Sequence, residues 1–183
     1  MDKITLNRIQ LLHPAVRQEA LTAYTYINNK LLGKGVRLRF AHTLRSLKEQ
    51  QALYAQGRTV LFDNNGKRLG RVTNARPGQS IHNYGLAIDI VLLLDKNSDG
   101  VFETASWDIK SDNDKDGLPD WMETVNHFKN LGWAWGGHWK SLPDYPHLEK
   151  TFGHTAQNLQ AKFNKGDVFT EVIQGITYKW VNI

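Results

Sequence analysis

The sequence predicts an α+β fold in a single domain. Its 183 residues are an ordinary length for one domain with a buried core. Both helical and strand-like apolar patterns occur along the chain. No Pro- or Ser-rich linker and no repeated module divides it, so no separate binding domain is expected.

The composition limits the possible chemistry. The chain has no cysteine, which excludes disulfides, thiolate metal sites and cysteine nucleophiles. Any transition metal must therefore be held by histidine and carboxylate groups. The formal charge of +5 suggests an anionic partner, either nucleic acid or an anionic cell envelope, but scattered basic residues are more typical of a solvated surface. No basic-aromatic strand motif or helix-turn-helix signal supports nucleic-acid binding.

The N-terminal half predicts a helix, a strand and a second helix, in that order. Apolar residues at helical spacing, with a proline in the first turn, indicate a helix over residues 14–32. Residues 36–42 alternate as a strand, and Ser46 is a suitable N-cap for a helix that ends near Gly57. A hairpin-type turn at 63–66, between two short apolar runs, indicates a small flap.

The segment from Ser80 to Asp89 carries the first candidate site. If His82 and Asp89 bind one zinc ion, their ligand atoms must lie about 3–4 Å apart. The seven positions from His82 to Asp89 would span roughly 23 Å in an extended chain. The chain must therefore turn between them, at residues 83–85. Residues 86–94 then read as a strand buried on both faces, with Asp89 as its one charge. The alternative is a turn-capping or arginine-paired Asp89 and an ordinary loop histidine.

A third ligand for the same metal is available further along the chain. A catalytic zinc uses three protein ligands and leaves one position for water. His147 completes the set, and Asp144 stands three residues before it, where it can accept a proton. Alternatively, Asp144 is a turn residue before Pro146, and His147 packs against the tryptophan-rich segment 133–139.

Together these blocks resemble the zinc D-Ala-D-Ala-type peptidases. The pattern Ser-x-His-x-x-Gly-x-Ala-x-Asp at 80–89, the tryptophan- and glycine-rich segment 133–139, and Pro-His at 146–147 occur in the family's order. The resemblance covers roughly residues 39–151 and is strongest to the L-alanyl-D-glutamate endopeptidase branch, which includes phage endolysins and bacterial cell-wall hydrolases. It implies a small antiparallel sheet flanked by helices, as in hedgehog-like relatives, with the zinc site on the sheet.

The resemblance also implies residue roles and a substrate. Zinc held by His82, Asp89 and His147 activates water, Asp144 acts as the base, and Arg45 steadies the developing oxyanion. Ser80 and Arg45 contact the substrate, the peptide stem of peptidoglycan, which is cleaved at the L-Ala–D-Glu bond. Surface roles for Arg45 and a turn role for Ser80 stay open. The alternatives are a D-Ala-D-Ala carboxypeptidase and a non-catalytic, calcium-dependent envelope-binding module.

An acidic insertion at about 95–123 predicts calcium as a second, structural or regulatory, cofactor. Its second loop fits all positions of the EF-hand pattern, with glycine at position six. The expected ligands are Asp112, Asp114, Asp116, the Leu118 carbonyl, Asp120 and Glu123. The first loop, with Asp95, Asn97 and Asp99, repeats only half of the pattern, because Ser106 occupies position twelve. The alternative for both loops is an acidic solvent-exposed segment. We expect calcium to order the second loop and so to position Asp144 and His147.

The last third predicts a helix over 119–131, a helix over 156–163 and a β-leaning segment over 168–183. No signal-peptide core and no membrane-spanning apolar run is evident, so synthesis in the cytoplasm and no membrane insertion are expected. The resemblance implies action on the cell wall after release, through a holin in the phage case. We expect a monomer consisting of the catalytic domain alone.

Overall fold

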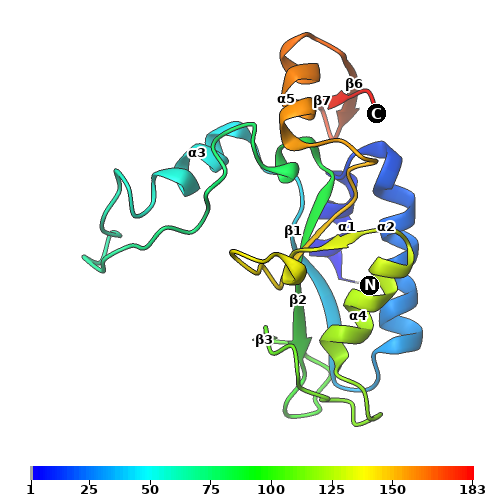
Figure 1. Cartoon of the computed structure of the whole chain (residues 1–183). Coiled ribbons are helices and arrows are strands. Elements are labelled where there is room, and N and C mark those ends of the chain that lie inside the picture. Colours follow the sequence, from blue (N-terminus) through cyan, green and yellow to red (C-terminus); the bar gives the residue numbers. More distant parts are fainter. Residues whose placement is uncertain (1) are drawn as a thin grey trace. The chain divides into compact units, whose positions relative to one another are not determined.

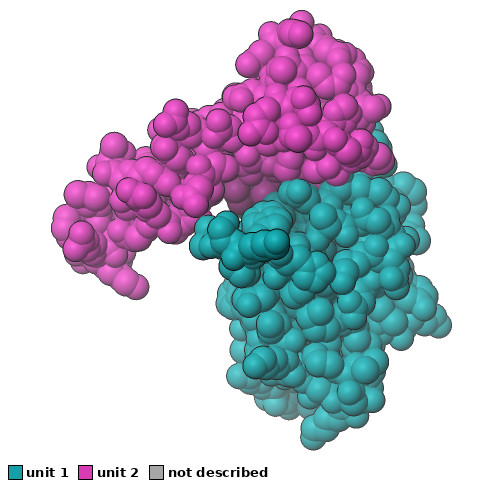
Figure 2. Space-filling model, viewed as in Figure 1, with its two compact units in different colours: residues 1–43, 87–150 teal, residues 44–86, 151–183 magenta. Residues whose placement is uncertain are grey.

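The structure, a computed structural model, describes residues 2–183 and forms two compact units. Among the described residues, unit 1 comprises 2–43 and 87–150, and unit 2 comprises 44–86 and 151–183. Figure 2 colours unit 1 teal and unit 2 magenta. The chain passes from one unit to the other three times, and the second passage follows directly on the His82 motif.

An antiparallel sheet forms the centre of unit 1, as predicted (Figure 1). Its order is β1-β2-β5-β4, with β3 paired to the far end of β2. Strand β2 pairs with neighbours on both edges, and each of its residues is buried except Asp89. The strands are β1 (Val36–His42), β2 (Ala87–Leu94), β3 (Thr104–Ser106), β4 (Ala134–Trp135) and β5 (His147–Glu149).

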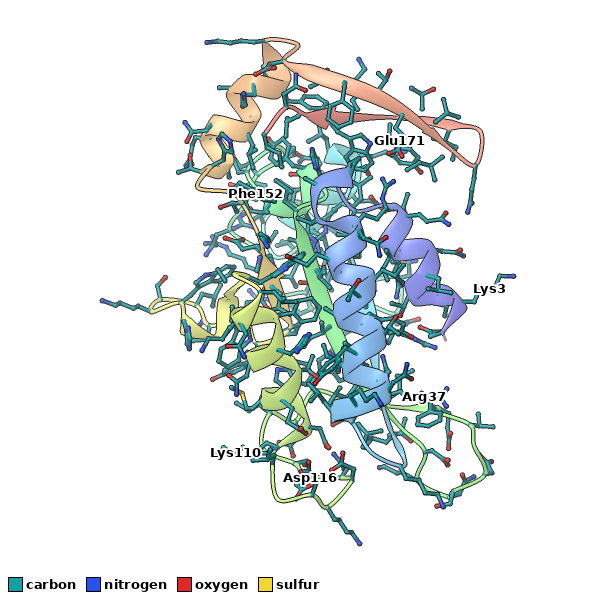
Figure 3. All side chains as sticks on the ribbon, turned by 90° about the vertical axis from the view of Figure 1, so that its right-hand side faces the viewer. Lys3, Arg37, Lys110, Asp116, Phe152 and Glu171 are labelled. Carbon is teal, nitrogen blue, oxygen red and sulfur yellow. The ribbon has the colours of Figure 1, made fainter. Side chains whose placement is uncertain are left out.

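Helices of unit 1 cover one face of this sheet (Figures 1 and 3). Phe40 on β1 is fully buried and meets the rings of Tyr24 and Phe128, which come from two different helices. Aromatic contacts therefore join the sheet to the helical layer. The helices are α1 (Lys3–Gln10), α2 (Pro14–Tyr26), its π-helical continuation η1 (Ile27–Leu31) and α4 (Asp120–Asn130), with a short 3-10 turn η3 (Gly136–His138) after β4.

The predicted N-terminal helix is confirmed, but its last turn is wider than an α-helix. The predicted span 14–32 divides into α2 and the π-helical turn η1. The Asn28 side chain pairs with both backbone groups of Leu38 on the neighbouring strand, which ties this turn to the sheet. Helix α1 was not predicted, because only Thr5 and Ile9 are buried within its eight residues and they give too short a periodic signal.

Unit 2 contains the predicted second and last helices and a β-hairpin. Helix α3 begins after Ser46, which forms a capping box with Glu49. Around the turn at 63–66 only isolated bridges form, so the flap has less strand structure than predicted. The elements are α3 (Leu47–Ala55), the 3-10 helix η2 (Ile81–Tyr84), α5 (Ala156–Asn164), β6 (Val168–Ile173) and β7 (Ile176–Val181).

Tyr84 and Gln160 join the two chain segments of unit 2. The Tyr84 hydroxyl donates to the Gly78 carbonyl, and its ring meets Phe163 on α5. The Gln160 amide donates to the carbonyl of Pro77, and a Cβ at Gly78 would collide with that side chain. The segment that leads into the His82 motif is thereby held against α5. In the described part of the chain, no helix is long and apolar enough to span a membrane.

We expect Phe40→Ala to destabilise the protein by about 3–5 kcal/mol, because it leaves a cavity between β1 and the helices. Urea unfolding followed by far-UV circular dichroism measures the change. Phe62→Ala is the control, since Phe62 is 58% exposed and its loss should cost about 0.5 kcal/mol or less. Equal effects of the two substitutions would contradict the described core.

Candidate metal centre

The pairing of β2 with β5 brings Asp89 and His147 together. They are direct partners in the antiparallel register, with Ile88 opposite Leu148 and Ala87 opposite Glu149. The His147 Nδ1 atom lies 3.3 Å from Asp89 Oδ1, and both side chains are largely buried. Two of the three predicted zinc ligands therefore stand side by side on the sheet, at the ligand separation that one metal ion requires.

His147 has a carboxylate on each side of its ring. Nδ1 faces Asp89, and Nε2 lies 2.8 Å from Glu149 Oε2. Burial favours the neutral imidazole, but the hydrogen bonds and charges of Asp89 and Glu149 outweigh it and raise the pKa of His147 to about 9. A neutral ring that binds a metal through Nδ1 can donate its Nε2 proton to Glu149, which fixes the ring's orientation.

Glu149 contacts the candidate ligand His147 and was not among the site residues predicted from the sequence. It lies two residues after His147, and in a strand such residues point to the same face of the sheet. That spacing is the signal that could have identified it. A strand of only three residues gives too little alternation to be recognised from sequence.

Gly136 holds the segment before His147 close to β4. The Asp144 amide donates to the Gly136 carbonyl, and the His147 amide donates to the Asp144 carbonyl. A Cβ at Gly136 would lie 2.5 Å from the Asp144 carbonyl oxygen and 3.0 Å from His147 Cβ. Only glycine fits here without displacing the chain. The backbone of Asp144 is thus fixed three residues before His147, with its side chain half-buried.

Two aromatic rings complete the surroundings of this segment. Trp135 donates its indole N–H to the Tyr145 carbonyl at 2.7 Å, which anchors the turn between Asp144 and Pro146. The Trp139 ring lies 5.0 Å from the His147 ring, measured between centroids. The tryptophan-rich segment 133–139 therefore packs against His147 within unit 1.

Unit 2 carries the other three predicted site residues, next to one another. The Arg45 amide donates to the His82 carbonyl at 3.0 Å, and the Asn83 side chain donates to the Arg45 carbonyl at 2.8 Å. Ser80 begins η2, where it forms a capping box with Asn83. The predicted turn is confirmed as this 3-10 helix, which ends at Gly85 with a positive φ of 69°.

Arg45 is further held by a buried side chain of α3. Its Nη1 donates to Gln50 Oε1 at 3.1 Å, and the Gln50 amide donates to the Ala75 carbonyl. Gln50 is fully buried although it is polar, so its hydrogen bonds have a positioning role for Arg45. His82 is 2% exposed, and Ala87, the first residue of β2, follows five residues later.

Comparison with known proteins identifies the family. The family described as D-alanyl-D-alanine carboxypeptidase, within peptidase family M15, matches residues 73–150. The peptidoglycan L-alanyl-D-glutamate endopeptidase CwlK of Bacillus subtilis is 44% identical over 138 residues, which cover 75% of this chain and 72% of CwlK. This chain belongs to peptidase family M15.

Members of this peptidase family are zinc-dependent, and the predicted resemblance is confirmed. Among solved structures, the L-Ala D-Glu endopeptidase ChiX of Serratia marcescens aligns with 83% of this chain and 90% of its own. The TM-score is 0.49 and the identity 19%. At this level of similarity, the assignment to the family rests on the sequence relationship to CwlK.

The donor set on the sheet fits zinc. One imidazole and one carboxylate are ligand types that zinc accepts, and Glu149 supplies the hydrogen bond that a zinc-bound histidine usually makes through its other nitrogen. We therefore expect Glu149→Gln to weaken zinc binding by about 10–100-fold. Competition with a chromogenic chelator measures this affinity. Glu103→Gln, which removes an exposed carboxylate of the same unit, is the control and should leave the affinity unchanged.

The raised pKa of His147 predicts how zinc binding depends on pH. Below a pKa of about 9 the metal-free ring is protonated, so a metal must displace a proton to bind. The apparent zinc affinity should rise with pH, by up to about tenfold per unit, and level off above pH 9. In Glu149→Gln the levelling should occur at lower pH. A zinc affinity that does not change between pH 7 and 9 would contradict this geometry.

Proposed function

We propose that this chain is a zinc-dependent endopeptidase that cleaves the L-Ala–D-Glu bond in peptidoglycan stem peptides. The observation that carries the proposal is the Asp89–His147 pair, oriented by Glu149, in a chain closely related to an enzyme with this activity. The identity of 44% extends over three quarters of the chain. The family match over residues 73–150 includes both the sheet residues and the His82 motif.

We propose His82 as the third zinc ligand. It occupies the histidine position of the family motif, and Asp89 follows only seven positions later. The positive φ of Gly85 ends the 3-10 helix and turns the chain directly into β2. When bound, zinc polarises a carbonyl and makes water nucleophilic at neutral pH. Buried, hydrogen-bonded ligands of this kind suit a catalytic zinc with one open position.

Three further residues have roles in this proposal. Asp144 takes the proton of the attacking water and delivers it to the leaving amine, and its backbone position three residues before His147 supports this assignment. Arg45 stabilises the negative charge that develops on the scissile carbonyl oxygen. Ser80 contacts the substrate peptide. The hydrogen bonds from Gln50 and Asn83 favour a functional rather than a surface role for Arg45, because they hold it in place.

The second candidate function is a D-Ala-D-Ala carboxypeptidase. The description of the matching family over residues 73–150 favours it, and it would use the same zinc ligands. The two activities differ in their products. An endopeptidase creates a new N-terminal D-glutamate within the stem, whereas a carboxypeptidase releases free D-alanine.

The test is mass spectrometry of peptidoglycan fragments after digestion by the zinc-loaded protein. We expect new N-terminal D-glutamate, and we expect Asp144→Ala to reduce its rate of formation by about 10²–10⁴-fold while zinc content stays unchanged. Release of D-alanine would move the assignment to the carboxypeptidase.

Two matched variants make this test specific. His147→Ala should lose both zinc and activity, since it removes a ligand. Asp108→Ala removes an exposed aspartate from the same unit and should retain both. No cleavage by the zinc-loaded wild-type protein would refute the enzymatic proposal and favour an envelope-binding module.

A further inference from the structure

The acidic loop before α4 gathers carboxylates that the proposed peptidase chemistry does not use. Figure 3 shows Asp116 on this loop, which leads into the helix. One carboxylate oxygen each from Asp112, Asp114 and Asp120 lie within 4.8 Å of one another. The same holds for Asp114, Asp116 and Glu123. Asp114 belongs to both groups, so five carboxylates surround one small region.

Two oxygens of this cluster are buried without a hydrogen-bond partner. Asp120 is fully buried, and its Oδ2 accepts from the backbone and side-chain nitrogens of Asn113 while its Oδ1 accepts from nothing. Glu123 Oε2 is likewise buried and unpartnered. A buried carboxylate oxygen without a partner costs free energy unless a cation meets it. The unpaired oxygens therefore point to a bound ligand of positive charge.

We propose that residues 112–123 bind one calcium ion. The ligands are the carboxylates of Asp112, Asp114, Asp116, Asp120 and Glu123 and the backbone carbonyl of Leu118. This site is separate from the zinc ligands and goes beyond the proposed peptidase activity. The loop's sequence pattern and the grouping of its carboxylates in space agree on the same five acidic residues.

The chemistry of the ligands selects calcium. Every candidate ligand is an oxygen, which disfavours zinc and other metals that prefer nitrogen or sulfur. Calcium accepts six to eight oxygens in a flexible arrangement, whereas magnesium demands a tight octahedron and retains several waters. A loop that offers five carboxylates and a carbonyl matches calcium. Gly117, at a φ of 97°, permits the sharp turn that directs these groups inward.

Calcium at this site would fix the start of α4 relative to the N-terminal helices. Asp120 is the first residue of α4, and Glu123 lies in its first turn. At the opposite side of the loop, Asp114 accepts a hydrogen bond from the Gly33 amide, just after η1. The ion would thus link two helical segments of unit 1 that are far apart in the sequence.

Terbium luminescence and calorimetry on the full zinc-loaded chain test the proposal. Terbium in the site should be sensitised by Trp121, which is adjacent to Asp120, and calcium should displace it. We expect calcium to bind with a dissociation constant between about 10⁻⁷ and 10⁻³ M and to raise the thermal midpoint. Glu123→Gln and Asp120→Asn should each weaken calcium binding by about tenfold or more.

Control variants keep this test separate from the peptidase proposal. His147→Ala should bind calcium as the wild type does, whether or not the chain proves to be an enzyme. Asp108→Asn removes one nearby negative charge outside the cluster and should also bind normally. Absence of calcium binding, equal affinity for magnesium, or unchanged binding in both loop variants would overturn the proposal.

Gly33→Ala offers a second, independent measurement. A Cβ at Gly33 would lie 2.9 Å from Asp114 Cβ and displace that ligand, although Gly33 is far from the loop in sequence. We expect weaker calcium binding in this variant. Gly70→Ala is the matched control, because a Cβ there meets no atom within 4 Å. Identical affinities in both glycine variants would contradict the role of Asp114.

Discussion

The pairing of β2 with β5 is the constraint on which the candidate site depends. Asp89 is a carboxylate inside an otherwise buried central strand, where it is costly unless a partner or a metal compensates it. The register places His147 directly opposite, and a further hydrogen bond from the Ile90 amide to the Pro146 carbonyl extends the pairing by one residue. A shift of one residue would turn His147 and Glu149 to the other face together.

The short strand β5 is held by its surroundings more than by its own length. Leu148 is fully buried between His147 and Glu149, so the alternation of the strand directs both functional side chains away from it. The opposite edge pairs with β4, where Trp135 and Gly136 also fix the preceding turn. Close packing, and not flexibility, thus explains the glycine at position 136, because only glycine allows the close approach to Asp144.

Long periodic segments could be predicted from the sequence, and short ones could not. The strand at 36–42 and the helices starting at Pro14 and after Ser46 and Thr155 have clear apolar periods or caps, and the structure confirms them. Strands β3, β4 and β5 have two or three residues each, which is too few for a period to appear. Their positions depend on pairing with β2, a tertiary effect.

The residues of the candidate site could likewise be predicted only in part. Asp89 and His147 were identified because they stand in recognisable motifs, and the structure brings them together. The orienting role of Glu149 depends on register, and the positioning role of Gln50 depends on its burial within unit 2. Four points stay predictions. They are the role of His82 as a ligand, calcium binding by the first acidic loop (Asp95, Asn97 and Asp99), the single-domain organisation and the monomeric state.

The chain's net charge conceals a strong separation of charges along the sequence. Nine of its 18 acidic residues lie within residues 95–123, against three of its 23 basic residues. That segment is therefore strongly negative although the whole chain is formally +5. At physiological salt, exposed charges act over only about 8 Å. The electrostatic potential at the loop is therefore set mainly by its own carboxylates, and distant lysine and arginine residues contribute little. The net positive charge of the whole chain therefore does not argue against a cation site in this segment, where the sign of the charge is reversed.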